Sequence, residues 1–274
     1  MAIVEIRNLT YRYPGSTKPS LYNINLSVDE GEFFLITGPS GCGKTTLCKC
    51  LNGLIPNSYG GDFDGEVIVD GLSTKNHPVY IIAQRVGLVF QDPENELFCT
   101  SVEKEIAFGL ENLGLPREEI RKRIEETIAM MGISHLRDRA PYELSGGEQQ
   151  KVAIAALLAM KPKILVLDEP TANLDPFSSK SVLDLLSRLK GEFGMTIILV
   201  EHRLEIVAKM ADRCAILNNG SIALIGKPEE VLYSDEAEAI GIGIPKVVRL
   251  TKALGIKNRP LSSKSLANFI MVRK

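Results

Sequence analysis

The sequence lacks the features that mark membrane-spanning, secreted or nucleic-acid-binding proteins. Its longest uninterrupted apolar runs are only a few residues, far short of the ~20 residues that span a bilayer. Met1–Glu5 contains no basic region followed by a long apolar one, so we expect no signal peptide. The formal net charge of −2 gives no electrostatic reason to expect nucleic acid as a partner. Any membrane role is therefore expected to come through a partner protein.

The chain also lacks the cysteine spacing of a metal site and any internal repeat or low-complexity segment. Its five cysteines are Cys42, Cys48, Cys50, Cys99 and Cys214. No two of them form a C-x-x-C pair, and no local histidine cluster accompanies them. We therefore expect reduced thiols in a cytosolic protein and no cysteine-bound metal.

What is present is enough apolar sequence for a sizeable core, since 45% of the 274 residues are hydrophobic. Strands are predicted from near the N-terminus to about residue 225. Val4 and Ile6 alternate with polar residues, as do Ile24 to Val28, whereas residues 8–15 are polar and are expected to form a turn. The apolar runs predicted to be strands buried in a mostly parallel sheet are 33–36, 86–90, 164–167 and 196–200.

Between about residues 92 and 160 the helical period replaces the strand pattern. Ile120, Ile124 and Ile128 recur every four residues, after a proline at 116 and before a glycine at 132. This pattern predicts a helical insertion in an α/β domain. The segment 226–274 is weakly patterned and ends in basic residues, which favours a solvated tail over a membrane-binding patch.

One glycine-rich segment, residues 38–46, has the form G-x-x-x-x-G-K-[ST]. It comes directly after an apolar strand and directly before a helix-compatible segment, which is the context that a phosphate-binding loop requires. Backbone N–H groups and the positive end of the helix would surround a polyphosphate. Lys44 can reach the β- and γ-phosphates, and the Thr45 hydroxyl can bind Mg²⁺.

Two acidic residues follow the buried run 164–167. Asp168 is placed at the strand end to hold Mg²⁺ opposite Thr45, and Glu169 is placed to polarise an attacking water. His202 follows the run 196–200, where an imidazole could bond the γ-phosphate. A lone histidine after a strand is more often an ordinary surface or core residue, so this role depends on the neighbouring motifs.

A second anion site is indicated at residues 144–150, which read Leu-Ser-Gly-Gly-Glu-Gln-Gln. Ser145 and Glu148 form an S-x-x-E capping box at a helix start, with Val152 on the buried face behind it. Gly146 and Gly147 are unfavourable in a helix, and their bare N–H groups would allow an anion to approach.

These motifs, in this order, resemble the ATP-binding-cassette (ABC) ATPases over residues 3–225. The resemblance implies an α/β P-loop NTPase with a RecA-like, mostly parallel sheet, an N-terminal antiparallel β part, a helical insertion at about 92–160 and a small extension at 226–274. In this family two ATPase domains pair head to tail, so that each nucleotide lies between the phosphate loop of one and the signature of the other.

The resemblance also implies roles for single residues. Glu169 would be the general base, His202 the γ-phosphate sensor, and Asp175 a contact across the interface. Ser145, Gly146, Gly147 and Glu148 would form the signature, in which the family usually has glutamine at position 148. The nucleotide-binding set would be Tyr13, Gly38, Pro39, Ser40, Gly41, Cys42, Gly43, Lys44, Thr45, Thr46 and Gln91, with Lys44 catalytic. Thr45, Gln91 and Asp168 would hold Mg²⁺. Tyr11 is as plausible as Tyr13 for stacking on adenine.

Residues 90–98 and 105–116 are similar to the energy-coupling-factor (ECF) subgroup, whose ATPases power uptake of vitamins or of cobalt and nickel ions. The resemblance implies a second ATPase subunit, identical or paralogous, together with an integral-membrane scaffold protein and a substrate-binding membrane protein. It places the chain on the cytoplasmic face of the cell membrane. Glu94, Glu96, Glu103 and Glu105 are expected to receive a basic partner helix.

Two other classes remain as alternatives. A soluble ABC ATPase of DNA repair or translation usually carries a long coiled-coil insertion or two cassettes in one chain, and this sequence has neither. A nucleotide-binding regulator without turnover would not need the acid at Glu169 or the imidazole at His202.

Overall fold

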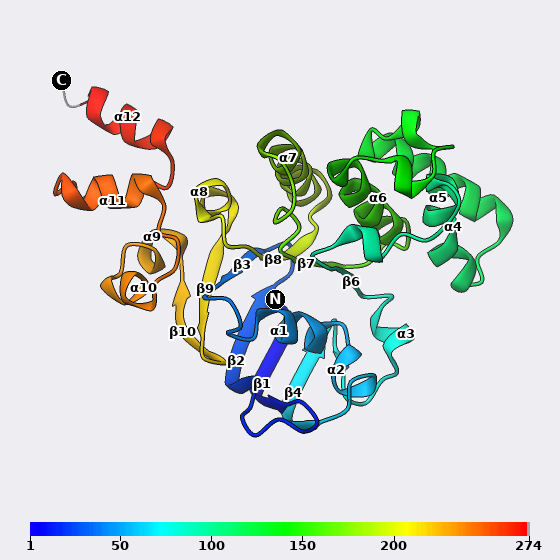
Figure 1. Cartoon of the computed structure of the whole chain (residues 1–274), viewed down its shortest axis with the longest axis horizontal. Helices are drawn as coiled ribbons and strands as arrows, with labels where there is room; N and C mark the ends of the chain where they lie inside the picture. Colours follow the sequence, from blue (N-terminus) through cyan, green and yellow to red (C-terminus); the bar gives the residue numbers. More distant parts are fainter. Residues whose placement is uncertain (273–274) are drawn as a thin grey trace.

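The computed structural model describes residues 1–272 as two β-sheets with helices around them (Figure 1). The strands are β1 (Ala2–Arg12), β2 (Leu21–Asp29), β3 (Phe33–Thr37), β4 (Asp62–Val69), β5 (Leu72–Ser73), β6 (Val86–Val89), β7 (Ile164–Asp168), β8 (Thr196–Val200), β9 (Arg213–Asn218) and β10 (Ser221–Gly226). The α-helices are α1 (Lys44–Leu51), α2 (Leu54–Asn57), α3 (Val79–Ile82), α4 (Val102–Asn112), α5 (Arg117–Met131), α6 (Gly146–Ala159), α7 (Pro176–Phe193), α8 (Leu204–Val207), α9 (Pro228–Val231), α10 (Asp235–Ile240), α11 (Lys246–Ala253) and α12 (Ser263–Val272). Short 3₁₀ helices are η1 (Pro93–Asn95), η2 (Ser134–Leu136), η3 (Pro141–Glu143) and η4 (Ala208–Met210).

The smaller sheet is antiparallel, with the strand order β2-β1-β4-β5. Its N-terminal strand is longer than the sequence predicted, because β1 continues through residues 8–12, where we expected a turn. Asn8 has a positive φ of 50°, and the β1–β4 register shifts beside it, as in a β-bulge. Opposite this point lies Gly65, where a Cβ would come within 2.5 Å of the Asn8 carbonyl oxygen. The bulge therefore accommodates the polar residue without ending the strand.

The larger sheet has the order β10-β9-β3-β8-β7-β6, in which every pairing is parallel except that of β10 with β9. Strand β3 is buried along its whole length. Phe33 and Leu35 pack into one hydrophobic cluster, and Phe34 and Ile36 pack into the other. Burial on both faces explains why this strand is continuously apolar. The α/β fold with a mostly parallel sheet and an antiparallel N-terminal part is confirmed.

Helices fill the chain between β6 and β7, as the helical period predicts, and they lie to one side of the larger sheet (Figure 1). Helix α5 begins after Pro116 and ends at Gly132, whose φ of 67° forms the C-cap. Ile124, Ile128 and Met131 are buried on the face of α5 that meets the core.

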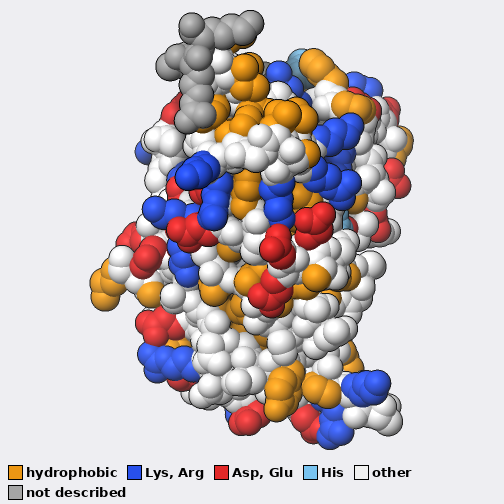
Figure 2. Space-filling view, turned by 90° about the vertical axis from the view of Figure 1, so that its left-hand side faces the viewer, with side chains coloured by type: hydrophobic (Ala, Val, Ile, Leu, Met, Phe, Trp, Pro, Cys, Tyr) orange, Lys and Arg blue, Asp and Glu red, His pale blue; other side chains and the backbone are white. Residues whose placement is uncertain are grey.

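The C-terminal segment, expected to be a weakly patterned extension with a basic, solvated end, folds into α9–α12 and joins the core. Val231, Ile244, Val248 and Leu266 are buried in the same hydrophobic cluster as Phe33. On the face of the molecule where these helices lie, Lys and Arg side chains gather in a band beside exposed apolar groups (Figure 2). Basic residues 273–274 lie outside the described part of the chain. Within residues 1–272, no helix is both long and apolar enough to span a bilayer.

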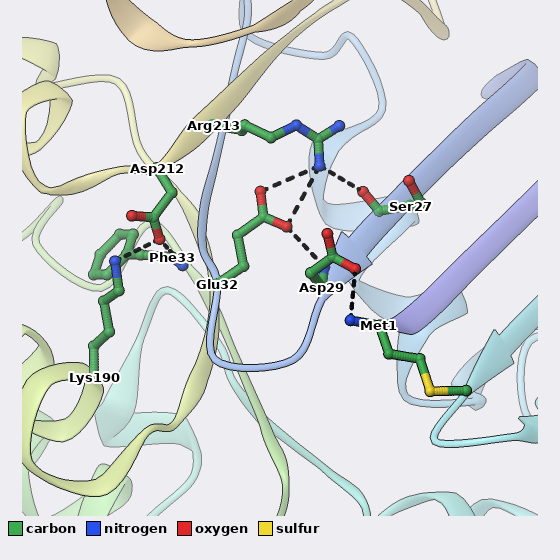
Figure 3. A network of polar contacts seen from close by, with 8 residues as sticks. All are labelled: Met1, Ser27, Asp29, Glu32, Phe33, Lys190, Asp212 and Arg213. Carbon is green, nitrogen blue, oxygen red and sulfur yellow. Dashed lines mark hydrogen bonds and ion pairs between the residues drawn. The ribbon is translucent and has the colours of Figure 1, made fainter.

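A polar network fixes the chain where it enters β3 (Figure 3). The Arg213 guanidinium donates to the buried carboxylate of Glu32 at 3.2 Å and to the Ser27 carbonyl of the smaller sheet at 3.1 Å. Asp212 accepts the Phe33 N–H at 2.8 Å. Contacts from both sheets thus hold the start of the strand that leads into the glycine-rich loop.

Candidate functional site

The glycine-rich loop connects β3 to α1, and its conformation depends on glycine. Gly38, Gly41 and Gly43 have φ values of 152°, 75° and 108°. A Cβ on Gly38 would lie 2.0 Å from the Leu217 carbonyl oxygen, so no side chain fits there. Helix α1 begins with Lys44, directly after Gly43. The loop and the helix start therefore have the arrangement that binds a polyphosphate.

Lys44 is buried inside this loop. Its Nζ donates to the carbonyl oxygens of Gly38 at 3.2 Å and Pro39 at 3.1 Å. It also lies 3.8 Å from Glu169 Oε1. Thr45, in contrast, is exposed at the start of α1. The ammonium group is thus placed by the loop itself.

Three predicted catalytic side chains meet at the ends of neighbouring strands. Strands β3, β8 and β7 are adjacent in the larger sheet, and Lys44, His202 and Glu169 follow them in that order. His202 Nε2 lies 2.9 Å from Glu169 Oε1. Glu169 has a φ of 52°, and its N–H donates to the Val200 carbonyl at 3.0 Å. The structure therefore brings both the proposed sensor and the cation within 4 Å of the proposed base, Glu169.

The carboxyl group of Asp168 suits a hard divalent cation. It is buried, and burial raises its pKa, an effect that a hydrogen bond from Thr45 opposes. Among the described residues, its Oδ1 has no hydrogen-bond partner. A buried carboxylate oxygen without a partner, beside a threonine hydroxyl, matches the oxygen ligands that Mg²⁺ prefers. Asp168 and Thr45 therefore fit the predicted metal role.

Gln91 is not joined to this pair. It is exposed after β6 and lines a cavity of about 420 Å³ together with Gly146, Gln150 and Asn173. Across residues 1–272, no hydrogen bond links Gln91 to Thr45 or Asp168. Its contact with Mg²⁺ stays a prediction.

The two tyrosines differ in exposure. Tyr11 is fully buried, and its hydroxyl donates to the Gly60 carbonyl at 2.8 Å. Tyr13 is half-buried, its hydroxyl lies 3.3 Å from Thr46 Oγ1, and its ring meets that of Tyr59 edge to face. Only Tyr13 of the two leaves part of its ring free beside the loop, so it is the candidate for stacking on a base.

The signature residues lie at the start of α6, away from the glycine-rich loop. The Glu148 carboxylate accepts the Ser145 N–H at 2.8 Å and its hydroxyl at 2.7 Å, and these bonds lower the pKa of Glu148. A Cβ on Gly147 would come within 2.7 Å of the Ser178 side chain. Close packing against α7 thus explains the absence of a side chain at Gly147, independently of any anion.

Asp175 caps α7. Its Oδ1 accepts the N–H groups of Phe177 at 2.8 Å and Ser178 at 3.1 Å, and these bonds lower its pKa. A helix-capping role therefore accounts for this aspartate within one chain, and its contact across an interface stays a prediction.

One functional candidate escaped the sequence reasoning. Glu201 lies between β8 and His202, is buried, and accepts hydrogen bonds from His202, Arg203 and Thr171. The sequence feature that could have identified Glu201 is an acidic residue directly after a continuous apolar run, the same feature that identified Asp168.

The acidic segment after Gln91 differs from the expected docking surface. Glu105 is buried, and its Oε2 accepts the N–H groups of Phe98 and Cys99. Glu103 pairs with Arg137, and Glu96 Oε1 accepts the Phe90 N–H at 2.7 Å. Three of the four carboxylates thus already bind groups of the same chain, either backbone N–H groups or a guanidinium. The expectation that all four would receive a basic helix is wrong.

Burial raises the pKa of Glu96 to about 7, which makes stability depend on pH. The folded state binds the proton more tightly than the unfolded state, whose pKa is 4.5, so stability falls as the pH rises from 4.5 to about 7. Glu96→Gln keeps an oxygen for the Phe90 N–H and removes the charge. We expect it to raise the free energy of unfolding at pH 8 by about 2 kcal/mol. Urea unfolding at pH 5 and pH 8 measures this.

The matched control is Glu94→Gln, because Glu94 is exposed on the same segment. It should change stability by less than about 0.5 kcal/mol at either pH. If Glu96→Gln raised the free energy of unfolding as much at pH 5 as at pH 8, the raised pKa of Glu96 would be contradicted.

Comparison with known proteins gives a consistent set of similarities. A family model described as "ABC transporter" matches residues 21–172. A relative from Pyrococcus abyssi, named a putative ABC transporter ATP-binding protein, is 47% identical over 267 residues, which cover 96% of this chain and 95% of that protein. A relative of the same name from Methanosarcina acetivorans is 45% identical over 95% of this chain. The chain spans only 41% of that relative's length and 45% of that of one from Methanosarcina mazei.

Two solved structures share the fold. The cbiO1 structure from Clostridium perfringens, described as part of the ABC transporter complex cbiONQ, is 34% identical with a TM-score of 0.77, and the match covers 92% of this chain and 99% of that one. A dimeric ATP-binding cassette in a post-hydrolysis state, with ADP and Pi bound, is 30% identical with a TM-score of 0.71 and covers 82% of this chain and 98% of that one.

Proposed function

The chain belongs to the ABC transporter family as an ATP-hydrolase domain, and from this premise we propose that it powers an ECF-type importer of a vitamin or a transition-metal ion. One observation carries the proposal of hydrolysis: Lys44 of the glycine-rich loop and His202 both lie within 4 Å of the Glu169 carboxylate. The similarity to cbiO1 supports the importer type.

In this proposal the glycine-rich loop and the residues after β7 and β8 have separate roles in hydrolysis. Residues 38–46 bind the phosphates of ATP, and Lys44 neutralises their charge. Glu169 accepts a hydrogen bond from the attacking water and takes up its proton, while His202 donates to the γ-phosphate. Thr45 and Asp168, with Gln91, would hold Mg²⁺, which supplies charge neutralisation when bound.

We further propose that residues 3–225 form the ATPase domain, with the helical part 92–160 inserted, and that 226–274 form an extension. The signature at the start of α6 would close the nucleotide site of a second ATPase subunit, identical or paralogous, and Asp175 would lie at that interface. The dimeric relative with ADP and Pi supports this pairing.

The surface beside Gln91 supports docking of a membrane partner. A groove of about 350 Å³ is lined mainly by apolar side chains of α3, α4, α6 and the segment 96–98. Phe98 and Phe108 are 66% and 44% exposed, and their rings meet edge to face with centroids 4.9 Å apart. Exposed aromatic rings over a hollow mark an interaction site. We assign it to an apolar helix of an integral-membrane scaffold protein, which also carries the substrate-binding membrane protein and places this chain at the cytoplasmic face.

Phe98→Ser together with Phe108→Ser tests this docking. We expect at least about a 10-fold loss of co-purification with the integral-membrane proteins encoded beside this chain, because exposed aromatic anchors dominate such interfaces. The chain would be tagged, co-expressed with those proteins and recovered from solubilised membranes. The control is Phe193→Ser, since Phe193 is 54% exposed at the end of α7, outside the groove.

If the double variant recovered the membrane proteins as well as the unaltered chain does, the groove would be excluded as their docking site. Failure of the unaltered chain to recover any of them would contradict the transport role and favour the alternative, a soluble ABC ATPase of DNA repair or translation.

A further inference from the structure

We propose that Glu201 is a positioning residue, which holds His202 against Glu169 and ties it to the segment 171–175. The inference rests on the proposed ATP hydrolysis and assigns a role to a residue outside the motifs. Glu201 does not reach the nucleotide loop itself. It acts through the residues that its carboxylate binds.

The carboxylate of Glu201 is almost completely buried, and both of its oxygens accept hydrogen bonds. The side chain is 1% exposed, and the backbone N–H donates to the Ile36 carbonyl at 3.1 Å. Oε1 accepts the N–H groups of His202 at 2.9 Å and Arg203 at 3.1 Å. Oε2 accepts the Thr171 hydroxyl. A buried carboxylate with three donors forms strong, charge-assisted hydrogen bonds, so its geometry is well defined.

The first two bonds fix the backbone that carries the sensor. By accepting two successive N–H groups, Glu201 closes the chain into a tight turn directly after β8. The His202 imidazole leaves this turn toward β7, where Nε2 meets Glu169 Oε1 at 2.9 Å. A small rotation of the turn would change that distance, and reactions of this kind are sensitive to misplacement of about 1 Å.

The third bond reaches the segment after Glu169. Thr171 is held from two sides, because its hydroxyl donates to Glu201 while its carbonyl accepts Arg203 Nη1 at 3.1 Å. The same Nη1 donates to Ser179 Oγ in α7 at 2.9 Å. Glu201 and Arg203 thus hold Thr171 between the chain turn that follows β8 and the N-terminal part of α7.

These hydrogen bonds connect His202, beside the proposed nucleotide site, to the proposed subunit interface. The segment that they hold runs from Thr171 to Asp175, and Ser179 N–H donates to the Asp175 carbonyl at 2.9 Å. A movement of His202 on loss of the γ-phosphate would therefore be passed to Asp175 through bonded groups. The other links between the two loops lie closer to the strands, where the Glu169 N–H donates to the Val200 carbonyl and the Glu169 carboxylate meets His202.

The chemistry of each variant separates positioning from general stability. Glu201→Gln keeps an acceptor for the two N–H groups, and the Thr171 hydroxyl can turn to accept from the new amide. Glu201→Ala removes all three acceptors. Thr171→Val removes one bond and keeps the shape of the side chain, so it tests the third bond in a protein that folds even if Glu201→Ala does not.

The test compares kcat for ATP hydrolysis, the Kd for ATP and the thermal midpoint in these variants, alone and combined with His202→Ala. We expect kcat to fall about 30-fold for Glu201→Ala and about 5-fold for Thr171→Val, with Kd within about 3-fold and Glu201→Gln close to the unaltered protein. In the His202→Ala background neither change should lower kcat further, because positioning matters only while the imidazole is present.

Losses that multiply in the double variants would overturn the inference, since a merely structural role would act independently of His202. A Glu201→Gln protein as impaired as Glu201→Ala, or Glu201→Ala and Thr171→Val proteins with full kcat, would also overturn it. If the unaltered protein did not hydrolyse ATP, the proposed function would fall, and this inference with it. An active protein with unimpaired variants would exclude the inference alone.

Discussion

Lys44→Ala lowers the rate of ATP hydrolysis by about 10³-fold or more, because it removes a buried cation placed at the phosphates. The ammonium lies inside the glycine-rich loop, 3.8 Å from Glu169, where little water screens its charge. Phosphate release at saturating Mg-ATP measures the loss.

Lys49→Ala is the matched control for this variant. Lys49 lies on the same helix, but its Nζ stands over the Tyr59 ring at 4.2 Å. We expect its rate to stay within about 2-fold of the unaltered protein. Because Lys44 also bonds the Gly38 and Pro39 carbonyls, the thermal midpoint should be compared too. A Lys44→Ala protein that keeps a tenth of the activity would contradict the assignment.

Glu169→Gln lowers hydrolysis by about 10²–10⁴-fold, because the amide cannot take up a proton from water. The amide keeps nearly the same shape, so the contacts of Lys44 and His202 with phosphate remain. ATP therefore binds and is not consumed, and the closed pair of subunits accumulates. Gel filtration in Mg-ATP should show a dimer for this variant and a shift back to monomer when ATP is removed.

The double variant Lys44→Ala with Glu169→Gln is the control, because it loses the grip on phosphate and should stay monomeric in ATP. The sandwich mechanism would be excluded if Glu169→Gln remained monomeric with ATP, alone and with every candidate partner ATPase.

Local patterns predicted the core of the site well. The buried strands 164–167 and 196–200 were visible as apolar runs, and the acids and the histidine after them follow from chain order. Because neighbouring parallel strands end at one edge of the sheet, their following residues meet there. This geometry needs no knowledge of side-chain packing, so Glu169 and His202 could be placed together from the sequence.

Packing decided the cases that the sequence misjudged. Glu96 and Glu105 appear as surface charges in the sequence, but each satisfies backbone N–H groups of its own segment. The choice between Tyr11 and Tyr13 depended on which ring is covered: Tyr11 is fully buried in β1, whereas Tyr13 follows the strand and is half-buried. The C-terminal residues appeared weakly patterned because their helices are short and each buries only a few side chains.

By itself, the sequence determined the strand–loop–helix arrangement of the glycine-rich segment, the positions of the acids after buried strands, the helices between about residues 92 and 160, and the family. These depend on residue type and local spacing, which backbone geometry converts directly into structure. Only the tertiary structure decided that Ser178 leaves no room for a side chain at Gly147, that Phe98 and Phe108 are exposed beside an apolar groove while Glu105 is buried, and that Glu201 joins His202 to Thr171. Gly147 and Ser178 are 31 positions apart in the chain and Thr171 and Glu201 are 30 apart, and such contacts exist only after the helices and strands have packed.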